Sequence, residues 1–181
     1  MSAGPVVVVV GAPGAGKSSV GRRLAERLGV EFADSDTLIE ERAGKSVADI
    51  FVDDGEAAFR AMESDEIAAA LVSATGVLSL GGGAILDAST RARLAGHRVV
   101  WLRVSVGEAA RRVGLNASRP LLVGNVRGTL KALLDQRTPL YESVSTDIVD
   151  TDGLGVDEVV DVVLARMWPG AEPPLSGKAG S

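Results

Sequence analysis

The feature that most constrains this chain is the segment GAPGAGKS at residues 11–18. It fits the pattern G-x-x-x-x-G-K-[ST], whose glycines let successive backbone N–H groups turn toward one anion. A run of valines at residues 6–10 comes directly before it, and a helical pattern follows. A phosphate-binding loop requires this order of strand, turn and helix, because the helix N-terminus adds positive charge. The order argues against the alternative, a glycine-rich surface turn.

The last two residues of this segment predict how a nucleotide is held. Lys17 is expected to reach the β- and γ-phosphates. The Ser18 hydroxyl is expected to bind Mg²⁺ directly. The segment therefore predicts binding of a nucleotide together with a magnesium ion.

The composition narrows the classes of protein to which the chain can belong. Its 181 residues suit one domain, and the absence of cysteine excludes disulfides and thiolate metal sites and favours a reducing cytoplasm. No basic region precedes the valines, so neither a signal peptide nor a membrane span is supported. The net charge of −5 and the aromatic content of 3% disfavour a nucleic-acid-binding surface. We therefore expect a soluble cytoplasmic protein that binds neither nucleic acid nor a membrane.

Short apolar segments alternate with helical patterns along the chain. Strands are expected at residues 6–10, 30–33, 77–80, 98–104 and 147–150. Helices are expected at residues 17–28, 37–43, 56–74, 87–95, 105–112, 129–137 and 156–167, with a short one starting at Ser46. The alternation predicts a three-layer α/β/α fold with a central five-stranded parallel sheet, of the P-loop kinase type. Pro139 is expected to interrupt or kink its helix, and the Pro-, Gly- and Ser-rich tail at 169–181 to be disordered.

Candidate site residues follow two further strands. Asp34 and Asp36 lie two residues apart in an extended segment, so both can face the same side. One could hold a Mg²⁺-bound water while the other accepts a substrate hydroxyl; alternatively, both are turn residues and Asp36 caps the helix that starts at Thr37. The glycines at 81–83 either let a backbone N–H approach a ligand closely or form a flexible turn. Because the carboxyl ends of parallel strands share one edge, these groups are expected to converge with the phosphate loop.

Several arginines have both a plain and a functional explanation. Arg60 could form a solvated ion pair with Glu63, three residues on. Arg137 could simply complement a helix dipole, and Arg112 could do the same or stack on a base. Arg119 lies in an irregular segment, where it is either a solvated charge or a group that closes over a transferring phosphoryl group.

Taken together, these residues resemble the shikimate kinase family over nearly the whole chain, from about residue 6 to 167. The resemblance rests on several segments in order: 11–18, 34–36, Phe59-Arg60 with Glu63, 80–84, 119–121 and 137–141. It implies ATP-dependent phosphorylation of the 3-hydroxyl of shikimate, a step toward chorismate and the aromatic amino acids, with Mg²⁺ as the cofactor. It also implies a single kinase domain at residues 1–168.

The resemblance assigns roles on the substrate side. Asp36 would bind the substrate hydroxyls and take the proton, while Arg60 and Arg137 would bind the carboxylate. Residues of about 36–60 would form the substrate-binding segment. The backbone contacts to the substrate would come from Gly81, Gly82 and Gly83.

On the nucleotide side, the resemblance implies that Arg119 reaches the ATP phosphates from a lid at about residues 114–126. Arg119 would complete a catalytic set with Lys17 and Asp36. Asp34 would order Mg²⁺ through water. The ATP-binding residues would be Gly14, Ala15, Gly16, Lys17, Ser18, Ser19, Arg112 and Arg119.

Two other classes of function share part of this pattern. One is another small-metabolite kinase with the same loop, acting on gluconate or a nucleotide. The other is a non-catalytic nucleotide-binding regulator, although Lys17, Ser18 and Asp36 together argue against a protein without activity. In each case we expect a monomer.

Overall fold

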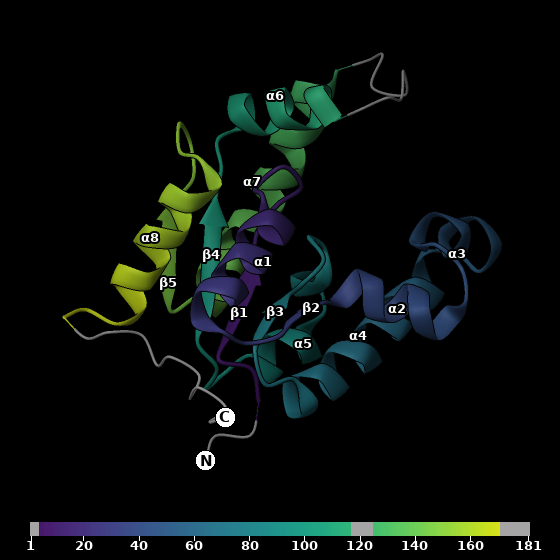
Figure 1. Ribbon diagram of the computed structural model, residues 1–181. Coiled ribbons are helices and arrows are strands. Elements are labelled where there is room, and N and C mark those ends of the chain that lie inside the picture. Colours follow the sequence, from purple (N-terminus) through teal and green to yellow (C-terminus); the bar gives the residue numbers. More distant parts are fainter. Residues whose placement is uncertain (1–3, 117–124, 171–181) are drawn as a thin grey trace.

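The computed structural model describes residues 4–116 and 125–170, which are organised around one five-stranded sheet (Figure 1). The strands are β1 (Val7–Val10), β2 (Phe32–Asp34), β3 (Val77–Ser79), β4 (Val99–Arg103) and β5 (Asp147–Asp150). Their order is β2-β3-β1-β4-β5, and every neighbouring pair is parallel. The predicted α/β fold with a central parallel sheet is therefore confirmed.

Helices connect the strands and cover the sheet on both faces. They are α1 (Lys17–Leu28), α2 (Ser35–Ala43), α3 (Val47–Asp53), α4 (Glu56–Ser73), the 3-10 helix η1 (Ala84–Leu86), α5 (Ala88–Arg93), α6 (Val106–Asn116), α7 (Val126–Val144) and α8 (Val156–Met167). The side chains of β1 alternate between two cores, as expected for a strand buried on both faces. Val7 and Val9 pack with residues of α1 and α8, whereas Val8 and Val10 pack with residues of α4, η1 and α7.

A smaller lobe projects from the carboxyl end of β2 (Figure 1). It consists of α2, α3 and the first part of α4, and its own core contains Ile39, Ile50 and Phe59. The Ser46 hydroxyl caps α3 by accepting a hydrogen bond from the Asp49 N–H, at 3.1 Å. This lobe contains the segment of about residues 36–60, so that segment packs on a core separate from the two beside the sheet.

Two boundary predictions were wrong for local reasons. The strand expected at 30–33 begins at Phe32, because the Val30 N–H still bonds to the Ala25 carbonyl at the end of α1. The helix expected at 129–137, with Pro139 interrupting or kinking it, begins at Val126 and continues through Pro139 to Val144.

The continuation of α7 past Pro139 has a packing reason. Leu134 and Tyr141, on either side of this proline, are buried in the same core. Burial of this face stabilises the helix although Pro139 removes one backbone hydrogen bond.

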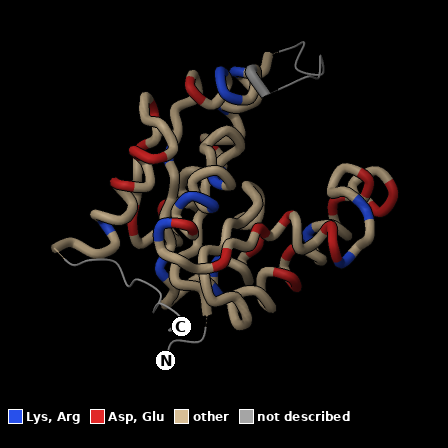
Figure 2. The backbone as a smooth tube through the Cα atoms, viewed as in Figure 1, with Lys and Arg blue, Asp and Glu red and all other residues tan. Residues whose placement is uncertain are grey.

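Charged residues of both signs occur along most of the helices (Figure 2). Acidic residues are frequent on α8 and on the lobe formed by α2, α3 and the start of α4 (Figure 2). Among the described residues, none of the helices combines the length and the apolar character needed to cross a bilayer. The predicted tail at 169–181 lies almost entirely outside the described residues, as does the middle of the predicted lid.

Candidate functional site

The phosphate loop connects β1 to α1 and has a backbone that only glycine adopts readily. Gly14 and Gly16 have φ angles of 84° and 85°, in the left-handed region. A Cβ atom added at Gly14 would lie 3.1 Å from the carbonyl oxygen of Ala109 in α6. The pattern-based expectation of a tight loop before α1 therefore has a direct structural reason: the loop turns sharply and packs closely against α6.

Lys17 begins α1 and its ammonium group lies inside the loop. The Lys17 Nζ donates a hydrogen bond to the carbonyl of Ala12, at 3.1 Å. Burial lowers the pKa of Lys17 to about 8, although the nearby carboxylates of Asp36 and Asp34 oppose this shift. An incoming anion would stabilise the charged form of this ammonium group.

Asp34 joins the phosphate loop to the start of α2. Its Oδ1 accepts hydrogen bonds from the backbone N–H groups of Asp36 and Thr37, at 2.9 and 3.4 Å. Its Oδ2 accepts a hydrogen bond from the Ser18 hydroxyl, at 3.1 Å. The cap of this helix is therefore Asp34, and the alternative in which Asp36 caps it was wrong, because α2 begins two residues earlier than expected, at Ser35.

The Asp36 carboxylate is consequently available to a ligand. Burial and the neighbouring Asp34 raise its pKa, whereas Lys17 opposes the rise. Its Oδ1 lies only 2.7 Å from the place where a Cβ atom at Gly81 would be, so a side chain at that position would displace the carboxylate. Asp36, Lys17 and the glycine segment are thus brought together, as expected from their places at strand ends.

The glycine segment that follows β3 forms a tight turn with fixed hydrogen bonds. The Gly81 N–H donates to the Ser35 hydroxyl at 2.9 Å, and the Gly81 carbonyl accepts from the Ala84 N–H at 3.0 Å. The Gly82 carbonyl accepts a hydrogen bond from the Tyr141 hydroxyl, at 2.5 Å. The sequence left open a flexible turn and a close backbone approach to a ligand, and these bonds argue against the flexible turn.

Two guanidinium groups pack on this segment. The Arg60 guanidinium lies 2.5 Å from the place of a Cβ atom at Gly83, and Arg137 Nη1 lies 3.5 Å from the corresponding place at Gly82. The Nε atoms of both arginines are buried and have no hydrogen-bond partner among the described residues. Buried donors without acceptors are costly, and a bound carboxylate would supply the acceptors that are missing.

The ion pair of Arg60 with Glu63 is not solvated, so the explanation of Arg60 as part of a solvated ion pair was wrong. The Arg60 Nη1 donates to Glu63 Oε1 at 2.8 Å, and Glu63 is only 2% exposed. Burial raises the pKa of Glu63, and Arg60 opposes the rise. Because the start of α4 packs toward the glycine segment, the spacing of three residues that usually marks a surface pair here orients an arginine inside the site.

A cavity of about 740 Å³ lies beside the phosphate loop, between α6 and the turn from β5 into α8. Arg112 lines it and bridges its walls: its Nη2 donates to the Thr151 carbonyl at 2.9 Å, and its Nη1 to the Gly14 carbonyl at 3.1 Å. Thr151 was not anticipated, because nothing distinguishes it from any other turn residue in the sequence. Arg119 lies outside the described residues.

The oxygen atoms around Ser18 fit a magnesium ion. The Ser18 hydroxyl and Asp34 are within hydrogen-bond distance, and Ser79 stands opposite Asp34 in the parallel register of β2 and β3. The Ser79 hydroxyl is fully buried and has no partner within residues 4–116 and 125–170. The same residues contain no group of three His, Cys, Asp or Glu side chains suited to a metal, so phosphate and water oxygens would complete the octahedron that Mg²⁺ prefers.

Comparisons with known proteins identify relatives of this chain. The family model described as shikimate kinase matches residues 13–168. The shikimate kinase of Thermobifida fusca is 56% identical over 94% of this chain and 99% of its own length, and that of Salinispora arenicola is 56% identical over 90% and 98%. Among solved structures, the shikimate kinase of Acinetobacter baumannii in complex with shikimate superposes with a TM-score of 0.84, at 35% identity over 92% of this chain and 93% of that one. The shikimate kinase of Bacteroides thetaiotaomicron gives a TM-score of 0.82 at 28% identity, over 89% and 97%.

Proposed function

The chain belongs to the shikimate kinase family and phosphorylates shikimate with ATP, and we propose that both substrates meet where β1, β2 and β3 end. The observation that carries this placement is the pair of half-buried guanidinium groups of Arg60 and Arg137 beside the phosphate loop, whose buried Nε atoms have no hydrogen-bond partner among the described residues. They form a site for a carboxylate, and Asp36 provides an acceptor for hydroxyl groups across the same glycine turn. A small acid that carries hydroxyl groups would bind to both the guanidinium pair and the Asp36 carboxylate.

In this proposal the shikimate carboxylate lies between Arg60 and Arg137. A guanidinium group donates two parallel hydrogen bonds to a planar carboxylate, so two such groups fix the orientation of the ring. Backbone N–H groups of the segment Gly81 to Gly83 add neutral donors, and Asp36 accepts from the ring hydroxyls. The substrate-binding segment of about residues 36–60 thus supplies Asp36 to the hydroxyls and Arg60, near the start of α4, to the carboxylate. The second carboxylate ligand, Arg137, comes from α7.

Phosphoryl transfer then requires positioning and charge neutralisation more than covalent chemistry. The oxygen of the 3-hydroxyl attacks the γ-phosphorus, the bond from that phosphorus to the β,γ-bridging oxygen breaks, and ADP leaves. The hydroxyl proton passes to the carboxylate of Asp36, whose raised pKa makes it a better acceptor. Lys17 neutralises charge on the phosphates, and we assign the same task to Arg119 in a lid of about residues 114–126.

Nucleotide and metal binding are assigned to the opposite side of the phosphate loop. We propose that the loop from Gly14 to Ser19 binds the ATP phosphates and that Arg112 contacts the base in the cavity beside it. Ser18 would hold Mg²⁺ directly, and Asp34 would hold it through water. The Ser79 hydroxyl, which has no hydrogen-bond partner in the part of the chain that the structure describes, supports this placement. When bound, the ion supplies positive charge to the phosphate oxygens.

A coupled assay of ADP release tests the assignment against its alternatives. ADP release that depends on shikimate, with little release on gluconate or nucleoside monophosphates, is the expected result. Release that depends on gluconate or a nucleoside monophosphate would identify another small-metabolite kinase. Binding of ATP without release on any acceptor would identify a non-catalytic regulator.

The lowered pKa of Lys17 predicts that nucleotide affinity depends on pH. In the free protein this ammonium group loses its proton around pH 8, whereas bound phosphates keep it charged, so nucleotide binding takes up a proton above that pH. The Kd for Mg–ADP is therefore expected to rise about fivefold between pH 8 and pH 9. Calorimetry across this range measures it. Lys17→Arg, which stays charged, is the control and should show a flat profile.

Replacing Arg119 with alanine is expected to reduce kcat more than it raises either KM. A group that contacts the phosphoryl group chiefly in the transition state contributes to turnover and little to ground-state binding, and such groups are worth about 10²-fold or more. Steady-state kinetics with each substrate varied in turn measures both effects. A raised KM for ATP with kcat intact would make Arg119 a binding residue only.

We further propose that the protein works as a monomer in the cytoplasm, without nucleic acid or a membrane as partner. The carboxylate and phosphate sites described above are all supplied by one chain. Light scattering coupled to size-exclusion chromatography, with and without both substrates, tests the monomer.

A further inference from the structure

The glycine turn after β3 is held from two sides by residues next to the proposed substrate ligands. Ser35, which accepts the Gly81 N–H, precedes Asp36. Tyr141, which donates to the Gly82 carbonyl, lies on α7 one turn beyond Arg137. The glycine turn is therefore hydrogen-bonded on one side to the residue before Asp36, the proposed acceptor of the substrate hydroxyls. On its other side it is hydrogen-bonded to the residue one helical turn after Arg137, a proposed ligand of the substrate carboxylate.

The bond from Tyr141 also fixes the direction of a backbone donor. In a trans peptide the C=O of one residue and the N–H of the next point in opposite directions. Because the Gly82 carbonyl points to Tyr141, the Gly83 N–H points away from Tyr141. Gly83 is buried, its N–H has no acceptor among the residues that the structure describes, and the Arg60 guanidinium occupies the space beside its Cα.

Tyr141 is held rigidly enough to serve as a reference for this turn. Its side chain is fully buried, and its ring stacks on that of Trp101 in β4, with centroids 5.7 Å apart and planes inclined by 23°. Burial raises the pKa of the Tyr141 hydroxyl to about 12, and Arg137 only partly opposes the rise. The phenol therefore keeps its proton and remains a donor at any pH at which the protein works.

We propose that Tyr141 is a positioning residue for substrate binding. Its hydroxyl holds the Gly82 carbonyl, which orients the Gly83 N–H and keeps Arg137 at a fixed distance from the glycine turn. The inference rests on the proposed function, since it concerns the same carboxylate site. Tyr141 acts through these groups and does not itself contact the substrate.

Kinetics of Tyr141→Phe test the proposal. The variant keeps the ring stack and loses only the hydroxyl, so we expect the KM for shikimate to rise about tenfold and the KM for ATP to stay within about twofold. Trp101→Phe, which weakens the same stack without touching the turn, is the control: its melting temperature should fall, with both KM values within about twofold. Equal effects of Tyr141→Phe on the two KM values, or none, would overturn the proposal.

A second measurement needs no substitution. Tyr141 is the only tyrosine of the chain, so uniform incorporation of 3-fluorotyrosine places one fluorine reporter beside the turn. Its ¹⁹F resonance is expected to shift on addition of shikimate and to stay in place on addition of gluconate. A resonance that shikimate leaves unmoved, in an enzyme that turns shikimate over, would refute the positioning role. An enzyme that fails to phosphorylate shikimate at all would instead refute the proposed function.

Discussion

Replacing Asp36 with asparagine is expected to lower kcat by about 10²-fold or more while the Kd for ATP stays within about twofold. Asparagine keeps the size of the side chain and its ability to bind a hydroxyl, but it cannot take the proton. The Asp36 carboxylate is not needed for the cap of α2, which Asp34 provides, so the helix should remain intact in the variant. Single-turnover phosphorylation of shikimate and calorimetry with Mg–ATP separate the two quantities.

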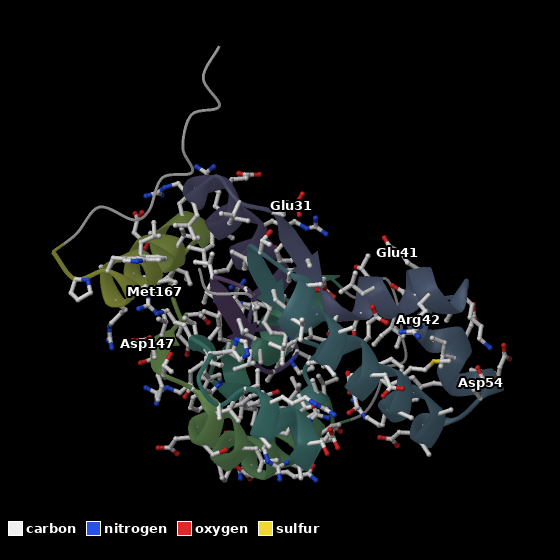
Figure 3. All side chains as sticks on the ribbon, turned by 90° about the horizontal axis from the view of Figure 1, so that it is seen from below. Glu31, Glu41, Arg42, Asp54, Asp147 and Met167 are labelled. Carbon is white, nitrogen blue, oxygen red and sulfur yellow. The ribbon has the colours of Figure 1, made fainter. Side chains whose placement is uncertain are left out.

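The matched control for this change is Glu41→Gln on the same helix. Glu41 is exposed, and its side chain projects outward from the lobe (Figure 3). Glu41→Gln removes the same charge as Asp36→Asn. An equal loss of kcat in both variants would therefore show that the effect comes from the change in net charge and not from proton transfer to Asp36. Unchanged turnover in the Asp36 variant would remove this residue from the mechanism.

Replacing Arg137 with alanine is expected to weaken shikimate binding by about 2 to 3 kcal/mol, a rise in Kd of about 30- to 150-fold. The side chain forms no ion pair with the described residues, so its loss leaves no carboxylate unpaired. Arg60→Ala would additionally leave Glu63 buried without its partner and so confound binding with stability. Calorimetry with shikimate alone measures the effect.

Lys131→Ala on the same helix serves as the control for Arg137→Ala. Lys131 pairs with Asp135 at the surface and is 67% exposed, so its removal should leave shikimate affinity unchanged. Equal affinity of the wild type and the Arg137 variant would refute the carboxylate site. Weaker binding of ATP by the Arg137 variant, with shikimate unaffected, would assign this arginine to the nucleotide instead.

The parts of the local geometry that could be predicted from the sequence are those with a local cause. The phosphate loop requires glycines in the left-handed region between a buried strand and a helix, and these features can be recognised from consecutive residues of the sequence. The convergence of Asp36 with the glycines at 81–83 follows from a general property of parallel sheets. Both inferences need the order of the elements but not their packing.

The parts that could not be predicted depend on packing between distant segments. The spacing of Arg60 and Glu63 is the same on a solvated helix face and on a buried one, and only the position of α4 against the glycine turn decides between them. The bond from Tyr141 to Gly82 joins residues 59 positions apart. Asp36 was a plausible cap as long as the helix was expected to start at Thr37, and only its actual start at Ser35 makes Asp34 the cap.

The two bonds of the Asp34 carboxylate have a thermodynamic consequence. One oxygen stabilises the first turn of α2, and the other is shared with the serine that would receive the metal. A bound ion that attracts this carboxylate would weaken its hydrogen bonds to the first turn of α2. Asp36 projects from the same turn. Occupancy of the nucleotide site and affinity for the acceptor are then linked quantities, and reciprocity requires that each substrate alter the binding of the other by the same factor.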